Sequence, residues 1–146
     1  MIGAGEVFQI YAVGDFSVTS SKPVLVMQGM DCEPTLSSAV PTTVWLTDYW
    51  FAVLPNFDNL IAVVRRAGQP VYLDGQVLDG FSSVGAGYDV ARVHLDPCPR
   101  ADVVCTHHLE GQFGFTMRGM DVLCSYALTA PTWVSCSDVE LMGCLN

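Results

Sequence analysis

The sequence predicts an all-β fold, a two-sheet antiparallel β-sandwich, and three observations support this. Short runs rich in β-branched and aromatic residues alternate with Gly, Pro, Asn or Asp along the chain. The segment VYLDGQVLD places Asp74-Gly75 between two apolar runs, and this dipeptide tolerates the positive φ angles of a tight hairpin turn. No stretch sustains a helical period, and residues 137–142 are expected to form at most a turn.

Each expected strand is a short apolar segment between two turn signals. In chain order, the expected strands are residues 7–13, 16–20, 24–28, 49–54, 60–65, 71–73, 76–78, 91–95, 103–107, 113–118 and 124–128. Because side chains alternate along a strand, every second residue is assigned to the interior. The inner faces are expected to draw on Val24, Val26, Phe51, Val53, Ile61, Val63, Phe113 and Phe115.

A six-residue motif occurs twice with small differences, as VMQGMD at residues 26–31 and as TMRGMD at residues 116–121. Both copies close a strand with a glycine, which suits a β-bulge. Two half-domains of similar structure would explain why the motif occurs twice. The sequence therefore suggests a sandwich with an internal two-fold repeat. A competing interpretation is that Asp31 and Asp121, with Glu33 nearby, converge on a calcium ion, although no EF-hand spacing is present.

Composition limits the class of protein and its partners. With 146 residues, 51% apolar and 14% charged, the chain has material for one well-packed domain over residues 1–146. No run reaches the roughly 18 apolar residues of a membrane helix, so no membrane insertion is expected. The net charge of −9, with basic residues scattered apart from Arg65-Arg66, argues against nucleic acid as a partner.

The cysteines indicate an oxidising compartment. An even count in a chain with a single lysine favours disulfides, and the absence of CxxC argues against a zinc ribbon. Six cysteines allow fifteen pairings. Spacing favours a bond between Cys98 and Cys105 and then one between Cys136 and Cys144, which leaves Cys32 to pair with Cys124. The cysteines expected to form disulfides are Cys32, Cys98, Cys105, Cys124, Cys136 and Cys144.

The chain is expected to be secreted or displayed on the cell surface, because disulfides persist outside the cytosol. Its first ten residues, MIGAGEVFQI, lack the pattern of a secretory signal. We therefore expect a single domain taken from a larger extracellular protein, with neighbouring domains of the same chain as further partners.

Residues that could carry chemistry are weighed against simpler roles. His107 and His108 are adjacent, so on a strand they point to opposite faces and cannot grip one metal together; one is expected to be buried and the other exposed. Gly85-Ala86-Gly87 lacks the third glycine of a phosphate loop and favours a turn. No GxSxG motif is present. We expect no catalytic residue, no metal, no cofactor and no enzyme; a hydrolase using the two histidines is the least supported alternative.

Acidic side chains are expected on the surface. A carboxylate pair of the kind that glycosidases use could come from this set, but solvated surface acids are the expected role. The carboxylates concerned are Asp48, Asp58, Asp79 and Asp89.

The segment WLTDYWFAVLPNFDN carries an unusual density of aromatic residues. Strand alternation puts Trp45 and Tyr49 on one face with Phe51 and leaves Trp50 on the other. Aromatic side chains that cannot all be internal are candidates for a binding patch toward protein or sugar. The candidate binding residues are Trp45, Tyr49, Trp50 and Phe57. Burial in the sandwich, or beneath a neighbouring domain, is the alternative.

Five segments in order resemble the N-terminal domain of the IgGFc-binding protein family. They are DFSVTSSKPVLVMQ, PTTVWLTDYWFAVLPNFDNLIAVV, VYLDGQVL, GAGYDVARVHL and HHLEGQFGFTMRGMDVLCSYAL, and the likeness covers roughly residues 8 to 130. The turn that the family has before its last strand is replaced here by DPCPRADVVCTHHLEG, which contains two cysteines.

The resemblance implies a β-rich module of large secreted or surface-anchored proteins that serves binding or adhesion. The leading hypothesis is therefore a non-catalytic extracellular adhesion or protein-binding module with an unidentified protein ligand. The alternative is a glycan-binding, lectin-like module, with or without calcium.

Overall fold

The computed structural model describes residues 3–30, 33–98, 104–121 and 125–129 and confirms the all-β prediction. Every pairing between its strands is antiparallel, and one 3-10 turn, Thr42–Val44, precedes the third strand. The strands are β1 Met27–Met30, β2 Glu33–Ser38, β3 Leu46–Val53, β4 Asp58–Arg66, β5 Val71–Leu73, β6 Gln76–Val77, β7 Ser82–Gly85, β8 Tyr88–His94, β9 Cys105–Met120 and β10 Ser125–Thr129.

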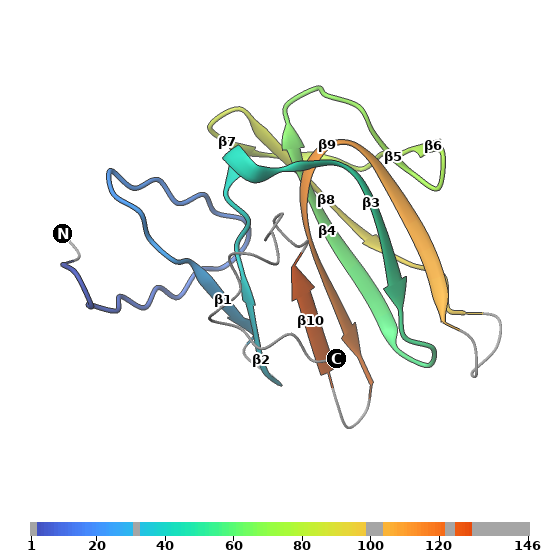
Figure 1. The fold of residues 1–146 in the computed structure, drawn as a ribbon, viewed down its shortest axis with the longest axis horizontal. Helices are drawn as coiled ribbons and strands as arrows, with labels where there is room; N and C mark the ends of the chain where they lie inside the picture. Colours follow the sequence, from blue (N-terminus) through green and yellow to red (C-terminus); the bar gives the residue numbers. More distant parts are fainter. Residues whose placement is uncertain (1–2, 31–32, 99–103, 122–124, 130–146) are drawn as a thin grey trace, which may run out of the picture.

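β9 joins all the strands from β3 to β10 into one curled eight-stranded sheet, so the two layers of the predicted sandwich are parts of the same sheet. One edge of this strand pairs with β3 and then β10, and the other edge pairs with β5 and then β4. At Gly111 the strand takes a φ of +112°, and a Cβ there would lie 2.6 Å from the carbonyl oxygen of Pro70, so only glycine fits. Figure 1 shows β9 as an arch with two descending legs. The first leg lies in a layer with β3, β5 and β6, and the second in a layer with β4, β7, β8 and β10.

The core lies between these two layers. Phe115, on the second leg of β9, packs its ring 5.2 Å from Tyr49 and 5.2 Å from Phe51, both on β3 of the first layer. Six of the eight predicted inner residues are buried: Phe51, Val53, Ile61, Val63, Phe113 and Phe115. The prediction was wrong for Val24, which is 48% exposed, and for Val26, which is half-buried, because the chain here leads into β1 and not into the sandwich.

The N-terminal segment differs from its prediction. Residues 7–13 and 16–20 form no strand, although their residue types favour one. β-Structure needs a neighbouring strand to satisfy its backbone hydrogen bonds, and these residues pair with none of the described strands. The segment contacts the second layer through an ion pair between Asp15 and Arg92 of β8.

The two copies of the repeated motif do not mark two equivalent halves. Met27–Met30 forms β1, which pairs with β2 in a separate two-stranded sheet. The second copy lies at the end of β9, between β4 and β10. The glycines also serve different purposes: the β1–β2 register shifts after Gly29, whereas Gly119 leaves room for the ring of Tyr126. The prediction of an internal two-fold repeat is therefore wrong, because the same motif occupies unlike positions.

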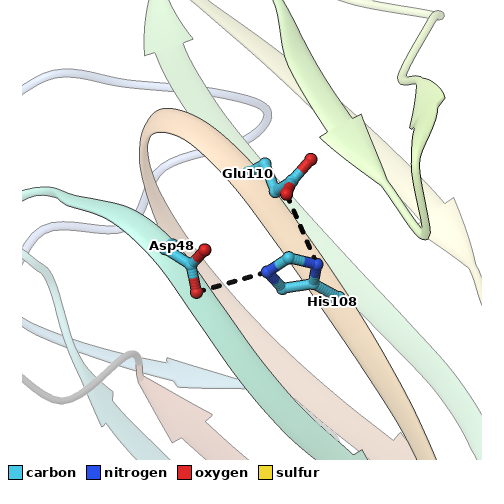
Figure 2. A group of neighbouring side chains, drawn as sticks. All are labelled: Asp48, His108 and Glu110. Atoms are coloured by element: carbon cyan, nitrogen blue, oxygen red, sulfur yellow. Dashed lines mark ion pairs between the residues drawn. The ribbon is translucent and has the colours of Figure 1, made fainter.

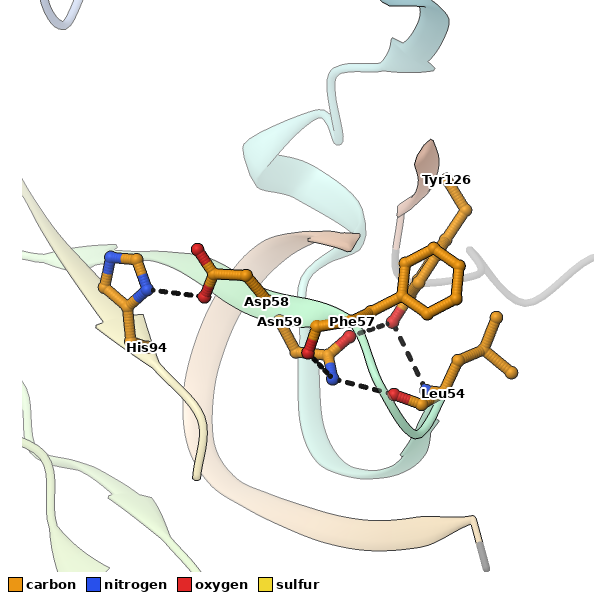
Figure 3. A network of polar contacts seen from close by, with 6 residues as sticks. All are labelled: Leu54, Phe57, Asp58, Asn59, His94 and Tyr126. Atoms are coloured by element: carbon orange, nitrogen blue, oxygen red, sulfur yellow. Dashed lines mark hydrogen bonds and ion pairs between the residues drawn. The ribbon is translucent and has the colours of Figure 1, made fainter. Parts of the chain in front are cut away.

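A buried polar network fixes the β3–β4 turn (Figure 3). Asn59 is 1% exposed, and its Nδ2 donates hydrogen bonds to the carbonyls of Leu54, at 2.9 Å, and Phe57, at 3.1 Å. The Tyr126 hydroxyl donates to Asn59 Oδ1, and burial raises the pKa of this phenol. This network joins β10 to the turn and satisfies a polar group that would otherwise destabilise the core.

Two further predictions are confirmed by local geometry. Asp74 and Gly75 have φ angles of 52° and 77° in the β5–β6 hairpin. Gly85, Ala86 and Gly87 all have positive φ in the turn between β7 and β8.

One predicted disulfide is confirmed. Cys98 and Cys105 are joined, with 5.7 Å between their Cα atoms, and both pack against the core. The other four cysteines, Cys32, Cys124, Cys136 and Cys144, lie outside the described residues, as do Asp31 and residues 137–142. Within the described parts of the chain, no helix has the length and apolar character that crossing a bilayer requires.

Candidate functional site

The four predicted binding residues do not come together in one patch. Tyr49 points into the core, whereas Trp50 points outward and is 65% exposed, as alternation predicted. Trp45 does not share the face of Tyr49, because the β3 register shifts between Leu46 and Asp48. This shift lets both Leu46 and Tyr49 pack against the core.

Trp45 and Phe57 are held by other aromatic rings. Trp45 packs edge-on against Tyr88, at 5.5 Å between ring centroids, and its Nε1 lies 2.6 Å from where a Cβ on Gly114 would be. Phe57 packs against Tyr126 at 5.4 Å, in the β3–β4 turn. A binding role for these residues stays a prediction, and Trp50 is the one of the four that is largely exposed.

The outer face of the first layer carries a set of polar and aromatic side chains, which we name the outer patch. Residues directly opposite each other in antiparallel strands share a face. Tyr72 on β5 lies opposite Val77 on one side and opposite Glu110 on the other. Asp48 also lies opposite Glu110, and Trp50 lies opposite His108. The outer patch therefore comprises Val77, Tyr72, Glu110, His108, Asp48 and Trp50, drawn from four neighbouring strands.

His108 is at the centre of the outer patch. Its ring stacks on Trp50 with 4.2 Å between centroids and an interplanar angle of 8°. Nε2 lies 3.2 Å from Asp48 Oδ1, and Nδ1 lies 3.7 Å from Glu110 Oε1. Figure 2 shows the imidazole between the two carboxylates, with Asp48 on β3 and the other two residues on β9. The ring thus has an aromatic partner on one face and a carboxylate near each nitrogen.

His107 occupies the opposite face of the same strand. Its Nδ1 lies 2.8 Å from Asp74 Oδ2, and its ring stacks on Phe51 at 5.6 Å. The prediction that the two histidines point to opposite faces is confirmed. The prediction that one is exposed is wrong, because both side chains are 16% exposed: Trp50 and Asp48 cover the outward one.

Asp74 contacts both histidines from the β5–β6 turn. Besides its bond to the His107 ring, its Oδ1 accepts a hydrogen bond from the backbone N–H of His108 at 2.8 Å. Burial raises the pKa of this carboxyl, but the bonds from His107 and from the His108 N–H outweigh burial, so the pKa lies below its ordinary value. Sequence reasoning assigned Asp74 to the turn and missed this second role, since the β5–β9 register creates it.

Both histidines face carboxylates in their described contacts, and neither is bonded there to a hydroxyl or thiol that it could activate. Exposed aromatic rings are common at surfaces that bind a ligand.

Comparison with known protein families finds a match for most of the chain. A family model described as IgGFc binding protein matches residues 1–119, which include the whole outer patch and both histidines. No curated protein and no solved structure matches the chain.

Proposed function

The chain belongs to the IgGFc-binding protein family, and from this premise we propose that it is a non-catalytic extracellular module that binds or adheres to protein through the outer patch. The observation that carries the proposal is the outward ring of Trp50, 65% exposed and stacked on His108. Large aromatic side chains held in one orientation contribute most to binding, because little conformational entropy is lost when a partner covers them.

The position of Trp50 supports this role. Among the described strands, β3 pairs with β9 alone, so it lies at the edge of the first layer. One face of the indole contacts His108, and the edge of the layer leaves the other open to a ligand. A partner could therefore pack on the ring without displacing any described strand.

The charge of the outer patch indicates the kind of protein that fits. Asp48 and Glu110 have side chains 65% and 47% exposed, and the whole chain has a net charge of −9. Opposite charges across an interface accelerate association and select partners. We therefore expect a protein surface that presents lysine or arginine beside an apolar group.

A glycan ligand is the second candidate. An exposed, flat indole with carboxylates on both sides of its stacked neighbour also suits a sugar ring, which packs on aromatic faces and donates hydroxyl hydrogen bonds to acids. A glycan array run with and without a chelator separates the two candidates and tests calcium assistance.

The proposal is tested by surface plasmon resonance with the immunoglobulin G Fc fragment, the probe that the family description names. Trp50→Ala should weaken binding by about tenfold or more. Leu128→Ala removes an apolar side chain of similar exposure, 56%, from the second layer and should leave binding unchanged. Fc binding that Trp50→Ala does not weaken would contradict the outer patch, and binding to glycans alone would favour the second candidate.

The non-catalytic part of the proposal is tested by activity assays. Panels of ester and glycoside substrates should yield no turnover. Turnover that His107→Ala or His108→Ala abolishes would overturn the non-catalytic part of the proposal.

A further inference from the structure

The outer patch holds metal-ligating groups that protein binding alone does not require. Asp48, His108 and Glu110 each offer one ligand atom, and these atoms lie within 4.8 Å of one another. We propose that the outer patch binds a divalent transition-metal ion such as Zn²⁺, with His108 Nε2 and an Asp48 oxygen as ligands and Glu110 behind the imidazole.

The spacing of the two ligand atoms fits a metal. His108 Nε2 and Asp48 Oδ1 are 3.2 Å apart. In a tetrahedral site with metal–ligand bonds of about 2.0–2.1 Å, neighbouring ligand atoms lie roughly 3.4 Å apart. The two atoms are therefore already close to the separation that one ion imposes, and the Asp48 side chain, 65% exposed, can adjust.

The state of the two ring nitrogens supports the same assignment. Nε2 is buried, and its 3.2 Å contact with Asp48 Oδ1 does not have the geometry of a hydrogen bond, so no described group forms a hydrogen bond with this nitrogen. Nδ1 faces Glu110 Oε1 at 3.7 Å. A histidine that binds a metal through one nitrogen usually turns the other toward a carboxylate, which fixes the tautomer and makes the ring a stronger ligand.

The ring is also held in place before any ion binds. Trp50 stacks on it, and Asp74 bonds both backbone groups of His108: its Oδ1 accepts the N–H, and its own N–H donates to the carbonyl at 2.8 Å. A preorganised ligand loses little freedom on binding, which raises affinity.

The donor set selects the class of metal. Calcium takes six or more oxygen ligands, whereas one imidazole nitrogen with carboxylate oxygens suits Zn²⁺, Cu²⁺ or Ni²⁺. Two protein ligands leave coordination positions open to water. This ion therefore differs from the calcium considered for Asp31 and Asp121.

His94 is the natural control. Its Nδ1 lies 3.0 Å from Asp58 Oδ1, so it also offers an imidazole beside a carboxylate. Its side chain is 69% exposed, whereas that of His108 is 16% exposed. Both positions thus have a histidine beside a carboxylate. They differ in the packing of the ring, which is restrained at His108 and exposed at His94.

The experiment is isothermal titration of Zn²⁺ into chelator-treated full chain, with free thiols alkylated and no reductant present. We expect about one ion per chain. His108→Gln and Asp48→Asn should each weaken binding by about tenfold or more, Glu110→Gln by about tenfold, and His94→Gln should leave it unchanged. Titration with Cu²⁺ should quench tryptophan fluorescence, and Trp50→Phe should remove most of that quenching.

Circular dichroism of each variant separates lost binding from lost folding. Should His108→Gln unfold, Asp48→Asn carries the test, because this side chain is largely exposed. Absence of zinc binding by the wild type, unchanged binding in Asp48→Asn, or loss of binding in His94→Gln would each overturn the site. The titration needs no partner protein, so its result is independent of the proposed function.

Discussion

His107 and His108 are neighbours on β9, are equally exposed at 16%, and each contact an aromatic ring and a carboxylate. His107 packs on Phe51 in the core and bonds to Asp74 of a hairpin turn. His108 packs on Trp50 at the surface and lies between two exposed carboxylates. The same residue types thus serve the fold on one face of a strand and, in our proposal, recognition on the other.

The difference lies in what surrounds each pair. On the inner face, the described partners of His107 are Phe51 in a packed layer and Asp74 in a tight turn, so a change there should alter the free energy of unfolding. On the outer face, the partners of His108 are held by the sheet below and remain open to solvent, so a change there should alter binding. The substitutions below test this division, from the largest expected effect to the smallest.

Two aromatic residues give the strongest contrast. Phe115 is 3% exposed and packs against Tyr49 and Phe51, so Phe115→Ala should lower the free energy of unfolding by about 3–5 kcal/mol. Trp50→Ala should lower it by less than about 1 kcal/mol, because the indole is mostly solvated. Urea unfolding measures both. Equal losses would contradict the assignment of inner and outer faces.

The disulfide at the start of β9 should have the next largest effect on the free energy of unfolding. Cys105 pairs with Cys98 and packs against the core. Removing this disulfide with a Cys98→Ser and Cys105→Ser double variant should lower the free energy of unfolding by about 2–3 kcal/mol, because the cross-link restrains the unfolded chain. Thermal unfolding checks the result; an unchanged melting temperature would show that the bond contributes nothing.

Asn59 and Asp58 repeat the contrast in β4. Asn59→Ala should cost about 1–3 kcal/mol, since it leaves two backbone carbonyls and the Tyr126 hydroxyl without their partner. Its neighbour Asp58 pairs with His94 at the surface, and Asp58→Ala should stay within about 0.5 kcal/mol. Chemical denaturation of the two variants distinguishes them, and a larger loss for Asp58→Ala would refute the structural role of the network.

Asp74 should make a smaller, pH-dependent contribution. Its pKa in the folded chain lies below the ordinary value of 3.8, so its ionised form stabilises the fold above that value. The contribution is lost as the pH falls from 3.8 through the folded pKa. The stability difference between wild type and Asp74→Asn should therefore be larger at about pH 6 than at about pH 3. Urea unfolding at both values checks this, and a difference independent of pH would contradict it.

Much of the fold could be predicted from the sequence, where local signals and packing agree. The bounds of Val71–Leu73 match their prediction, and Phe51 and Phe113 lie in the core as alternation required. β2 was missed because EPTLSS is polar and becomes a strand only by pairing with β1. Residues 7–13 have strand-forming composition but no partner strand in the part of the chain that the structure describes.

The candidate site could be predicted only in part. Alternation placed Trp50 outward, but it could not reveal the bulge that separates Trp45 from Tyr49, since the bulge is defined by pairing with β9. Two of the carboxylates beside the histidines, Asp48 and Asp74, come from distant parts of the chain: Asp74 is 33 residues from His107. Such contacts depend on strand register, which a single sequence does not specify.

The most direct test of the division between the two faces is to compare His107→Gln with His108→Gln in paired urea unfolding and zinc titration. We expect His107→Gln to lower the free energy of unfolding by about 1–2 kcal/mol and to retain zinc binding. His108→Gln should keep its stability within about 0.5 kcal/mol and lose at least about tenfold in zinc affinity. Two variants with the same loss of stability and the same zinc affinity would contradict the account.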